Sequence, residues 1–238
     1  MKKIFVCFML LAGLLWLTAP AQAAVISIEY NFQFSDDGSD PAGSIPWLIA
    51  TLEDAGDNTV KFTLTAGGLI NTEFVSNWYF NLNDSFNDLM NDEYFTFSDP
   101  DPAESIELIE LGSNSFTADG GGDFDIKISF PIPNNTGDLR FGSEDSTTFT
   151  IEFKPPTDYD GSDFNAASFI ADSVKGGPDP TVWPTAAHIQ SIDSDFSGWV
   201  TGDIAIEPSS IVPEPATVFL LGAGLIGLAA YGRRKFRK

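Results

Sequence analysis

Apolar and polar side chains alternate strictly near the start of the chain, and this pattern constrains the fold more than any other feature. From Ile26 to Phe34 every second residue is apolar, and the residues between them are polar. Successive side chains of a strand point to opposite faces of its sheet, so the segment predicts a strand with one buried face. No segment keeps the apolar period of a helix for long; Phe86 to Tyr94 is the best candidate, with about two turns. We therefore expect a chain built from strands.

Further short apolar segments follow, separated by clusters of Gly, Asp, Asn and Pro. Residues 54–58 are typical of a hairpin turn, and residues 172–184 of a long loop. A series of about eight to ten short strands with turn signals between them is typical of an antiparallel β-sandwich or jelly roll. We predict one all-β domain over residues 24–207. Its predicted strands cover residues 25–34, 47–52, 59–65, 74–82, 94–97, 106–111, 124–130, 147–153, 188–192 and 199–206.

Charge is distributed unevenly along the chain. The formal net charge is -22, yet seven of the twelve Lys and Arg residues lie at the two tips. Between Ala24 and Val212, five cations stand against 33 carboxylates. A surface so acidic repels phosphate backbones, which excludes nucleic acid as a partner. The same stretch is rich in Phe, Ile, Leu and Val, and about 190 residues are enough for one real core, so disorder is not expected.

The N-terminus has the three parts of a secretory signal peptide. Lys2 and Lys3 precede an apolar run, and the small residues Ala21 and Ala23 form a site for signal peptidase. We expect residues 1–23 to be removed on export. Cys7, the only cysteine, would be lost with them, leaving no thiol nucleophile, disulfide or Cys/His zinc cluster.

The C-terminus is typical of a single membrane span. A linker over residues 208–215 contains Pro213-Glu214-Pro215, residues 216–232 contain no charged residue, and residues 233–238 are basic. The uncharged run is about 24 Å long as a helix, and snorkelling by Arg233 and Arg234 would complete a bilayer crossing. The positive-inside rule places the basic tail in the cytoplasm and the acidic domain outside. A Gly-x-Gly-x-x-Gly sequence at residues 222–227 lies within this apolar run, so it implies no cofactor.

The order of triplet, Gly- and Leu-rich span and basic tail resembles the PEP-CTERM sorting signal of exopolysaccharide-producing Gram-negative bacteria. The residues that carry the resemblance are Pro213, Glu214, Pro215, Arg233 and Arg234, within Val212 to Lys238. The same tail is also catalogued as an ice-binding-protein C-terminal motif, a label that does not itself imply ice binding. The resemblance implies that an exosortase recognises the tail and cuts near the triplet. It implies an inner-membrane-tethered precursor, followed by release or transfer to the cell surface or extracellular matrix. The alternative is a Pro-rich stalk above a permanent anchor.

Asp158, Asp160 and Asp163 surround Gly161 in one short segment. Carboxylates on a turn are ligands that suit Ca²⁺, which takes about six to eight oxygens. The segment is not an EF-hand, because Phe169 stands where a bidentate Glu belongs. It predicts a calcium site, with the alternative that Asp and Gly only form turns on an acidic surface. Looser versions of the pattern occur at residues 36–40 and 119–125.

Other motifs give little support to an enzyme. His188, the only histidine, lies in a predicted strand. The chain has no Gly-x-Ser-x-Gly motif that would supply a nucleophile for it, so we expect a hydrogen-bonded structural role. Glycoside hydrolysis requires a pair of carboxylates, but among so many acidic residues no pair can be singled out as catalytic. Exposed tryptophans beside Asp and Asn would suit stacking on sugars, although most are expected in the core. The tryptophans of the predicted domain are Trp47, Trp78, Trp183 and Trp199.

Three hypotheses follow. The first, which we prefer, is a non-enzymatic surface or extracellular-matrix protein associated with exopolysaccharide or biofilm, exported by the secretion machinery and processed by an exosortase. The second is a carbohydrate- or calcium-binding module delivered by the same route. The third is a secreted hydrolase with dispersed acids.

Overall fold

The computed structural model describes residues 25–35, 38–102, 105–132, 139–174, 181–193 and 195–207. The predicted signal peptide, linker, membrane helix and basic tail lie outside these residues. No helix within the described ranges is long and apolar enough to cross a membrane.

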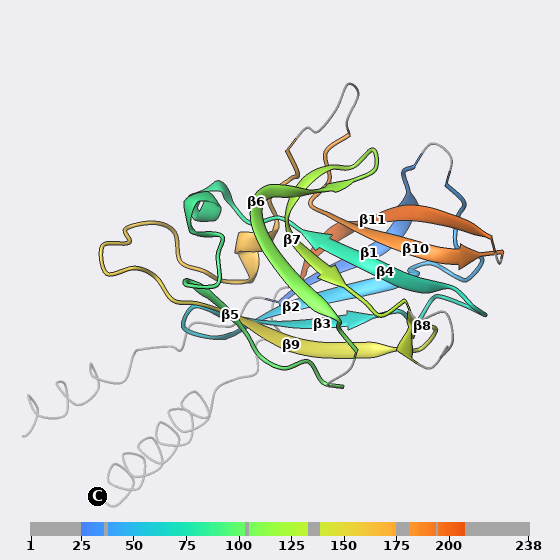
Figure 1. The fold of residues 1–238 in the computed structure, drawn as a ribbon, viewed down its shortest axis with the longest axis horizontal. Helices are drawn as coiled ribbons and strands as arrows, with labels where there is room; N and C mark the ends of the chain where they lie inside the picture. The colour runs from blue at the N-terminus through green and yellow to red at the C-terminus, as the bar shows by residue number, and fades with distance from the viewer. Residues whose placement is uncertain are drawn as a thin grey trace, which may run out of the picture. The chain divides into compact units, whose positions relative to one another are not determined.

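The described residues form one antiparallel sheet of eleven strands (Figure 1). The antiparallel all-β class is the predicted one, although the sequence predicts about eight to ten strands. The spatial order is β5-β9-β3-β2-β1-β11-β10-β4-β7-β6, and the short β8 pairs with β4. Two 3₁₀ helices, η1 (Asp84–Leu89) and η3 (Ala166–Phe169), lie in connections. The strands are β1 (Val25–Gln33), β2 (Leu48–Gly56), β3 (Thr59–Thr65), β4 (Phe74–Phe80), β5 (Phe95–Phe97), β6 (Leu108–Ala118), β7 (Gly122–Ser129), β8 (Phe141–Gly142), β9 (Ser146–Phe153), β10 (Thr185–Ile192) and β11 (Phe196–Glu207).

The sheet curls so that its two halves pack against each other. Four strands separate β3 from β4 in the sheet, yet the ring centroids of Phe62 of β3 and Phe80 of β4 lie 5.3 Å apart. Phe62 also stacks on Phe149 of β9 at 5.1 Å and meets Phe169 of η3 at 4.9 Å. Large apolar side chains from both halves thus fill one interior, which confirms the predicted all-β, sandwich-like fold.

A chain of buried polar contacts joins strands β1, β4 and β10. The ring of Trp78 meets that of Tyr30 edge-on at 5.0 Å, and its indole N–H donates to the Tyr30 hydroxyl. The Tyr30 hydroxyl in turn contacts Thr185 Oγ1, whose hydroxyl donates to the Tyr79 carbonyl at 2.6 Å. Burial raises the pKa of Tyr30 well above its usual value, because the phenolate would be desolvated.

The hairpin predicted at residues 54–58 joins β2 and β3. Gly56 has φ of 137° and Asn58 has φ of 52°, both in the region that favours Gly and Asn in tight turns. The helix predicted at residues 86–94 is wrong in extent: the structure has η1, which begins after Asn83 because the Asn83 side chain accepts from the Ser85 N–H.

Strand β6 is longer than the segment predicted at residues 106–111. It continues to Ala118 through an irregularity between Leu111 and Phe116, where Asn114 adopts φ of 47°. The small and polar residues of this irregularity hide the alternation that marks a strand. The two-residue β8 has too few residues to produce any period.

Candidate functional site

The register of four strands aligns one row of side chains across the sheet. Trp199 of β11 lies opposite His188 of β10, and His188 lies opposite Asn77 of β4. Asn77 lies opposite Ser129 of β7. Opposed residues on neighbouring strands share a face, so these four side chains point to the same side. Trp78, the neighbour of Asn77 on β4, lies in the core, which identifies this side as the outer one.

A second row lies on the same side, two residues further along β4. Tyr79 lies opposite Ala186 of β10 and Lys127 of β7, and Lys127 lies opposite Glu110 of β6. The Lys127 Nζ lies 2.9 Å from Glu110 Oε2, in a partly exposed ion pair. We use the term outer face for the seven residues Trp199, His188, Asn77, Ser129, Tyr79, Lys127 and Glu110.

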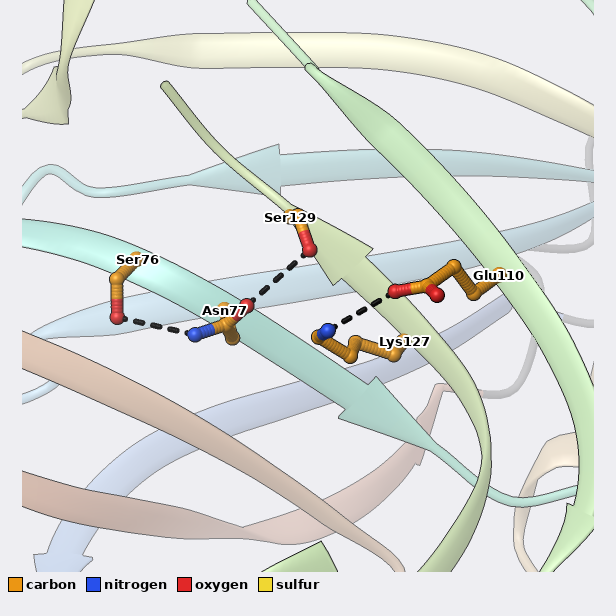
Figure 2. A network of polar contacts seen from close by, with 5 residues as sticks. All are labelled: Ser76, Asn77, Glu110, Lys127 and Ser129. Carbon is orange, nitrogen blue, oxygen red and sulfur yellow. Dashed lines mark hydrogen bonds and ion pairs between the residues drawn. The ribbon is translucent and has the colours of Figure 1, made fainter. Parts of the chain in front are cut away.

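The polar side chains of the outer face are held by hydrogen bonds (Figure 2). The Ser129 hydroxyl donates to Asn77 Oδ1 at 3.2 Å, and Asn77 Nδ2 donates to Ser76 Oγ at 3.3 Å. The ion pair of Lys127 and Glu110 lies beside this chain of contacts (Figure 2). The amide of Asn77 is therefore fixed in one orientation, while Asn77 and Ser129 each remain partly exposed.

Aromatic rings border the polar groups. Trp199 stacks on His188 with centroids 4.6 Å apart and planes at 22°, and Tyr79 lies 5.4 Å from Trp199. Phe34 lies 6.5 Å from Trp199 and 5.9 Å from Trp183. Trp199 and Trp183 are partly exposed, whereas Tyr79 is 5% exposed and packs in a buried cluster with Phe124 and Ala186.

Local packing changes the ionisation of two groups on the outer face. Burial lowers the pKa of His188, and the nearby charge of Asp119 opposes that shift in part. Burial raises the pKa of Tyr79 to about 12, and the charge of Glu110 adds to the effect. His188 is therefore neutral at neutral pH, and Lys127 and Glu110 compensate each other, so the outer face carries no net charge.

His188 does have a serine beside it, but the arrangement does not suit a hydrolase. Ser76 Oγ lies 2.9 Å from His188 Nδ1 and also 3.3 Å from the His188 carbonyl oxygen. Ser76 is 1% exposed, so a substrate could not reach its hydroxyl. The contact confirms that this histidine is hydrogen-bonded, as the sequence predicts.

The four tryptophans of the domain divide into two pairs. Trp47 and Trp78 are buried in the core, and the Trp47 indole N–H donates to the Gly43 carbonyl at 3.1 Å. Trp199 belongs to the outer face, and Phe34 lies between it and Trp183. Within the described residues, the Trp183 Nε1 and the Asn81 Oδ1 are buried without a hydrogen-bond partner, although Asn81 Nδ2 reaches the Trp183 carbonyl at 3.5 Å.

The predicted calcium ligands Asp158, Asp160 and Asp163 lie in one exposed loop between β9 and η3. In the described part of the chain, no three His, Cys, Asp or Glu side chains are grouped as a metal site would require. The glycine of this motif has a packing reason: a Cβ at Gly161 would lie 2.5 Å from the Tyr159 ring. Calcium binding by these three residues remains a prediction that awaits a binding measurement.

The looser acidic patterns have other local roles. At residues 119–125, Asp125 is 2% exposed and accepts from the N–H groups of Leu82 and Asn114 at 2.9 and 2.7 Å. Burial raises the pKa of the Asp125 carboxyl, although these two hydrogen bonds favour its charged form. Asp123 Oδ1 accepts from the Thr117 hydroxyl at 2.6 Å. At residues 36–40, Asp36 and Asp37 lie outside the described residues.

Sequence reasoning did not identify Asn77, Ser129, Lys127 or Glu110. A signal was present, since Lys127 and Ser129 alternate with the apolar Ile126 and Ile128. The alternation reveals a polar face of one strand, but it does not reveal which residues of neighbouring strands lie beside it.

The predicted processing residues lie outside the described residues. These are Ala21, Ala23, Pro213, Glu214, Pro215, Arg233 and Arg234. Residues 212–235 match the family model described as the PEP-CTERM protein-sorting motif. No curated protein and no solved structure matches the chain. An acidic antiparallel β domain therefore precedes a PEP-CTERM motif, which implies a secreted protein processed by an exosortase at the cell envelope.

Proposed function

We propose that the chain is a non-enzymatic surface or extracellular-matrix protein, associated with exopolysaccharide or biofilm in a Gram-negative bacterium. In this proposal an exosortase cuts the inner-membrane-tethered precursor near Pro213-Glu214-Pro215. The observation that carries the proposal is the sorting motif at residues 212–235, which begins after the last strand of the domain ends at Glu207.

The fold supports cleavage at that position. Strand β11 is complete at Glu207, and it lies between β1 and β10 within the sheet. A cut near residues 213–215 would therefore remove no strand and no core side chain of the described domain. The processed protein would keep its fold without the membrane segment.

The charge of the domain supports a role in a hydrated matrix. Because residues 24–212 hold five cations against 33 carboxylates, copies of the domain repel one another and remain dispersed. The same charge predicts weak attraction to anionic polymers unless cations bridge the two.

The test is the intact mass of the protein recovered separately from the membrane and extracellular fractions of its native host. We expect a mass that starts at Ala24 and ends near Pro215, in the extracellular or surface fraction. A mass that extends to Lys238 and occurs only in membranes would contradict exosortase processing and leave a simple single-span anchor.

A second candidate function is a carbohydrate- or calcium-binding module delivered by the same route. Of the two ligands, the outer face favours carbohydrate, because stacked aromatic rings lie beside hydrogen-bonding groups that are held in place. Glycan pull-down and calcium-dependent melting distinguish this candidate from a matrix protein without a specific ligand.

A further inference from the structure

We propose that the outer face binds an uncharged oligosaccharide laid across strands β11, β10, β4 and β7. The inference rests on the second candidate function and specifies its site and ligand class. The contact residues would be Trp199, Asn77, Ser129, Lys127 and Glu110.

The chemistry of the outer face matches the two kinds of surface on a sugar ring. The C–H groups of a pyranose form an apolar patch that packs on an aromatic side chain, and the partly exposed Trp199 offers one. The hydroxyl groups of the sugar both donate and accept, so they pair with an amide, a hydroxyl, an ammonium and a carboxylate. Asn77, Ser129, Lys127 and Glu110 supply one of each.

The spacing of these groups suits a chain of sugars. Neighbouring strands lie about 4.8 Å apart, so the row from Trp199 to Ser129 presents side chains at roughly regular intervals over three strand steps. One strand step is similar in length to one pyranose unit of a polysaccharide. The hydrogen bonds from Ser129 to Asn77 and from Asn77 to Ser76 hold the row in place before a ligand arrives.

The row leads toward a hollow in the surface. A depression of about 390 Å³ is lined by Glu107, Pro131, Ile132 and Leu139. The Glu107 N–H donates to the Ser129 carbonyl at 2.9 Å, so the depression begins beside the last residue of the row. Ile132 and Leu139 are more than 40% exposed, and they offer a further apolar contact at that end.

Charge selects the class of ligand. The outer face has no net charge, because Lys127 and Glu110 form an ion pair and His188 is neutral. The chain as a whole carries a net charge of -22, which repels an anionic polysaccharide. An uncharged, hydroxyl-rich ligand incurs no such repulsion and uses both the rings and the polar row.

The test measures binding of uncharged hexasaccharides to the full chain purified in detergent. The probes are a β-1,4-glucan, an α-1,4-glucan and a mannan. Tryptophan fluorescence and calorimetry measure their binding. We expect at least one probe to bind, and Trp199→Ala and Asn77→Ala each to weaken its binding at least tenfold. Because Trp199→Ala also removes packing against Tyr79, Ser129→Ala serves as a variant that leaves the aromatic contacts in place.

The matched control is Thr63→Ala. Thr63 pairs with Thr148 in the other half of the sheet, with its Oγ1 3.4 Å from Thr148 Oγ1, and we expect it to leave binding unchanged. Failure of all three probes to bind, or binding that Asn77→Ala and Ser129→Ala do not weaken, would overturn the proposal. Binding only to an anionic polymer would overturn it as well. Export and processing are read separately from the intact mass, so the two proposals fail independently.

Discussion

Val25 and Glu207 lie opposite each other in the antiparallel pair of β1 and β11. The first and last described residues of the domain are thus neighbours at the same end of two central strands. The sheet order places four strands beyond β1 on one side and four beyond β11 on the other, where β8 also pairs with β4. The two ends of the described domain therefore lie side by side, and the pairing of β1 with β11 joins the two parts of the sheet.

Truncation tests this arrangement. A chain of residues 24–207 should unfold in one cooperative thermal transition, because it retains every strand. A chain of residues 24–198 should show no such transition, since it lacks Val200 and most of the strand that joins β1 to β10. Circular dichroism during heating measures both. A cooperative transition in the shorter chain would show that the sheet does not depend on β11.

Replacement of Phe62 by Ala should strongly destabilise the domain. Phe62 is fully buried and contacts Phe80, Phe149 and Phe169, so the change leaves a cavity between the two halves of the sheet. Phe→Ala changes at such positions cost about 3–5 kcal/mol, measurable by denaturant unfolding. Phe196→Ala is the matched control, because Phe196 is 56% exposed and should change stability by less than about 1 kcal/mol.

Asp125→Asn should destabilise the domain, because Asp125 of β7 accepts hydrogen bonds from Leu82, just after β4, and from Asn114 in β6. One of the N–H groups of Leu82 and Asn114 would then face an amide NH₂ group instead of an acceptor. Leaving one buried donor without a partner costs about 1–3 kcal/mol. Denaturant unfolding measures the loss, and Asp57→Asn at an exposed turn is the control. Equal stability of the two variants would show that the two hydrogen bonds to Asp125 do not stabilise the domain.

Stability should fall as the pH decreases below about 6.5, through the titration of His188. Burial lowers the folded-state pKa of His188, so the unfolded chain takes up this proton more readily. The loss begins near the unfolded pKa and continues down to the folded pKa. His188→Gln should remove this part of the pH dependence, as measured by unfolding free energies between pH 5.5 and 7.5. Identical slopes for the two proteins in that range would rule out a contribution from His188.

Calcium is tested by melting in Ca²⁺ and in Mg²⁺ at equal ionic strength. The structure leaves Asp158, Asp160 and Asp163 exposed and does not group them, so we expect equal melting temperatures in the two salts. A higher melting temperature in Ca²⁺ that Asp160→Asn abolishes would instead support the calcium site that the sequence predicts.

Most of the strands and the sorting motif follow from local patterns in the sequence. Alternation is a local property, so the strand at residues 59–65 is predicted with the bounds that the structure has. The motif at residues 212–235 also consists of consecutive residues, so it can be identified without knowledge of the fold. The loss of alternation at Asn114 explains why the second half of β6 was missed.

The neighbours of each strand do not follow from local sequence, because strand pairing depends on contacts between residues that are distant in the chain. Asn77 and Ser129 are 52 positions apart, and Asn77 and His188 are 111 apart, yet all three belong to one row. Trp78 and Trp199 are the same residue type in similar strands, but the curl of the sheet buries the first and leaves the second at the outer face. Burial depends on what the rest of the chain places over a side chain, and local sequence does not carry that information.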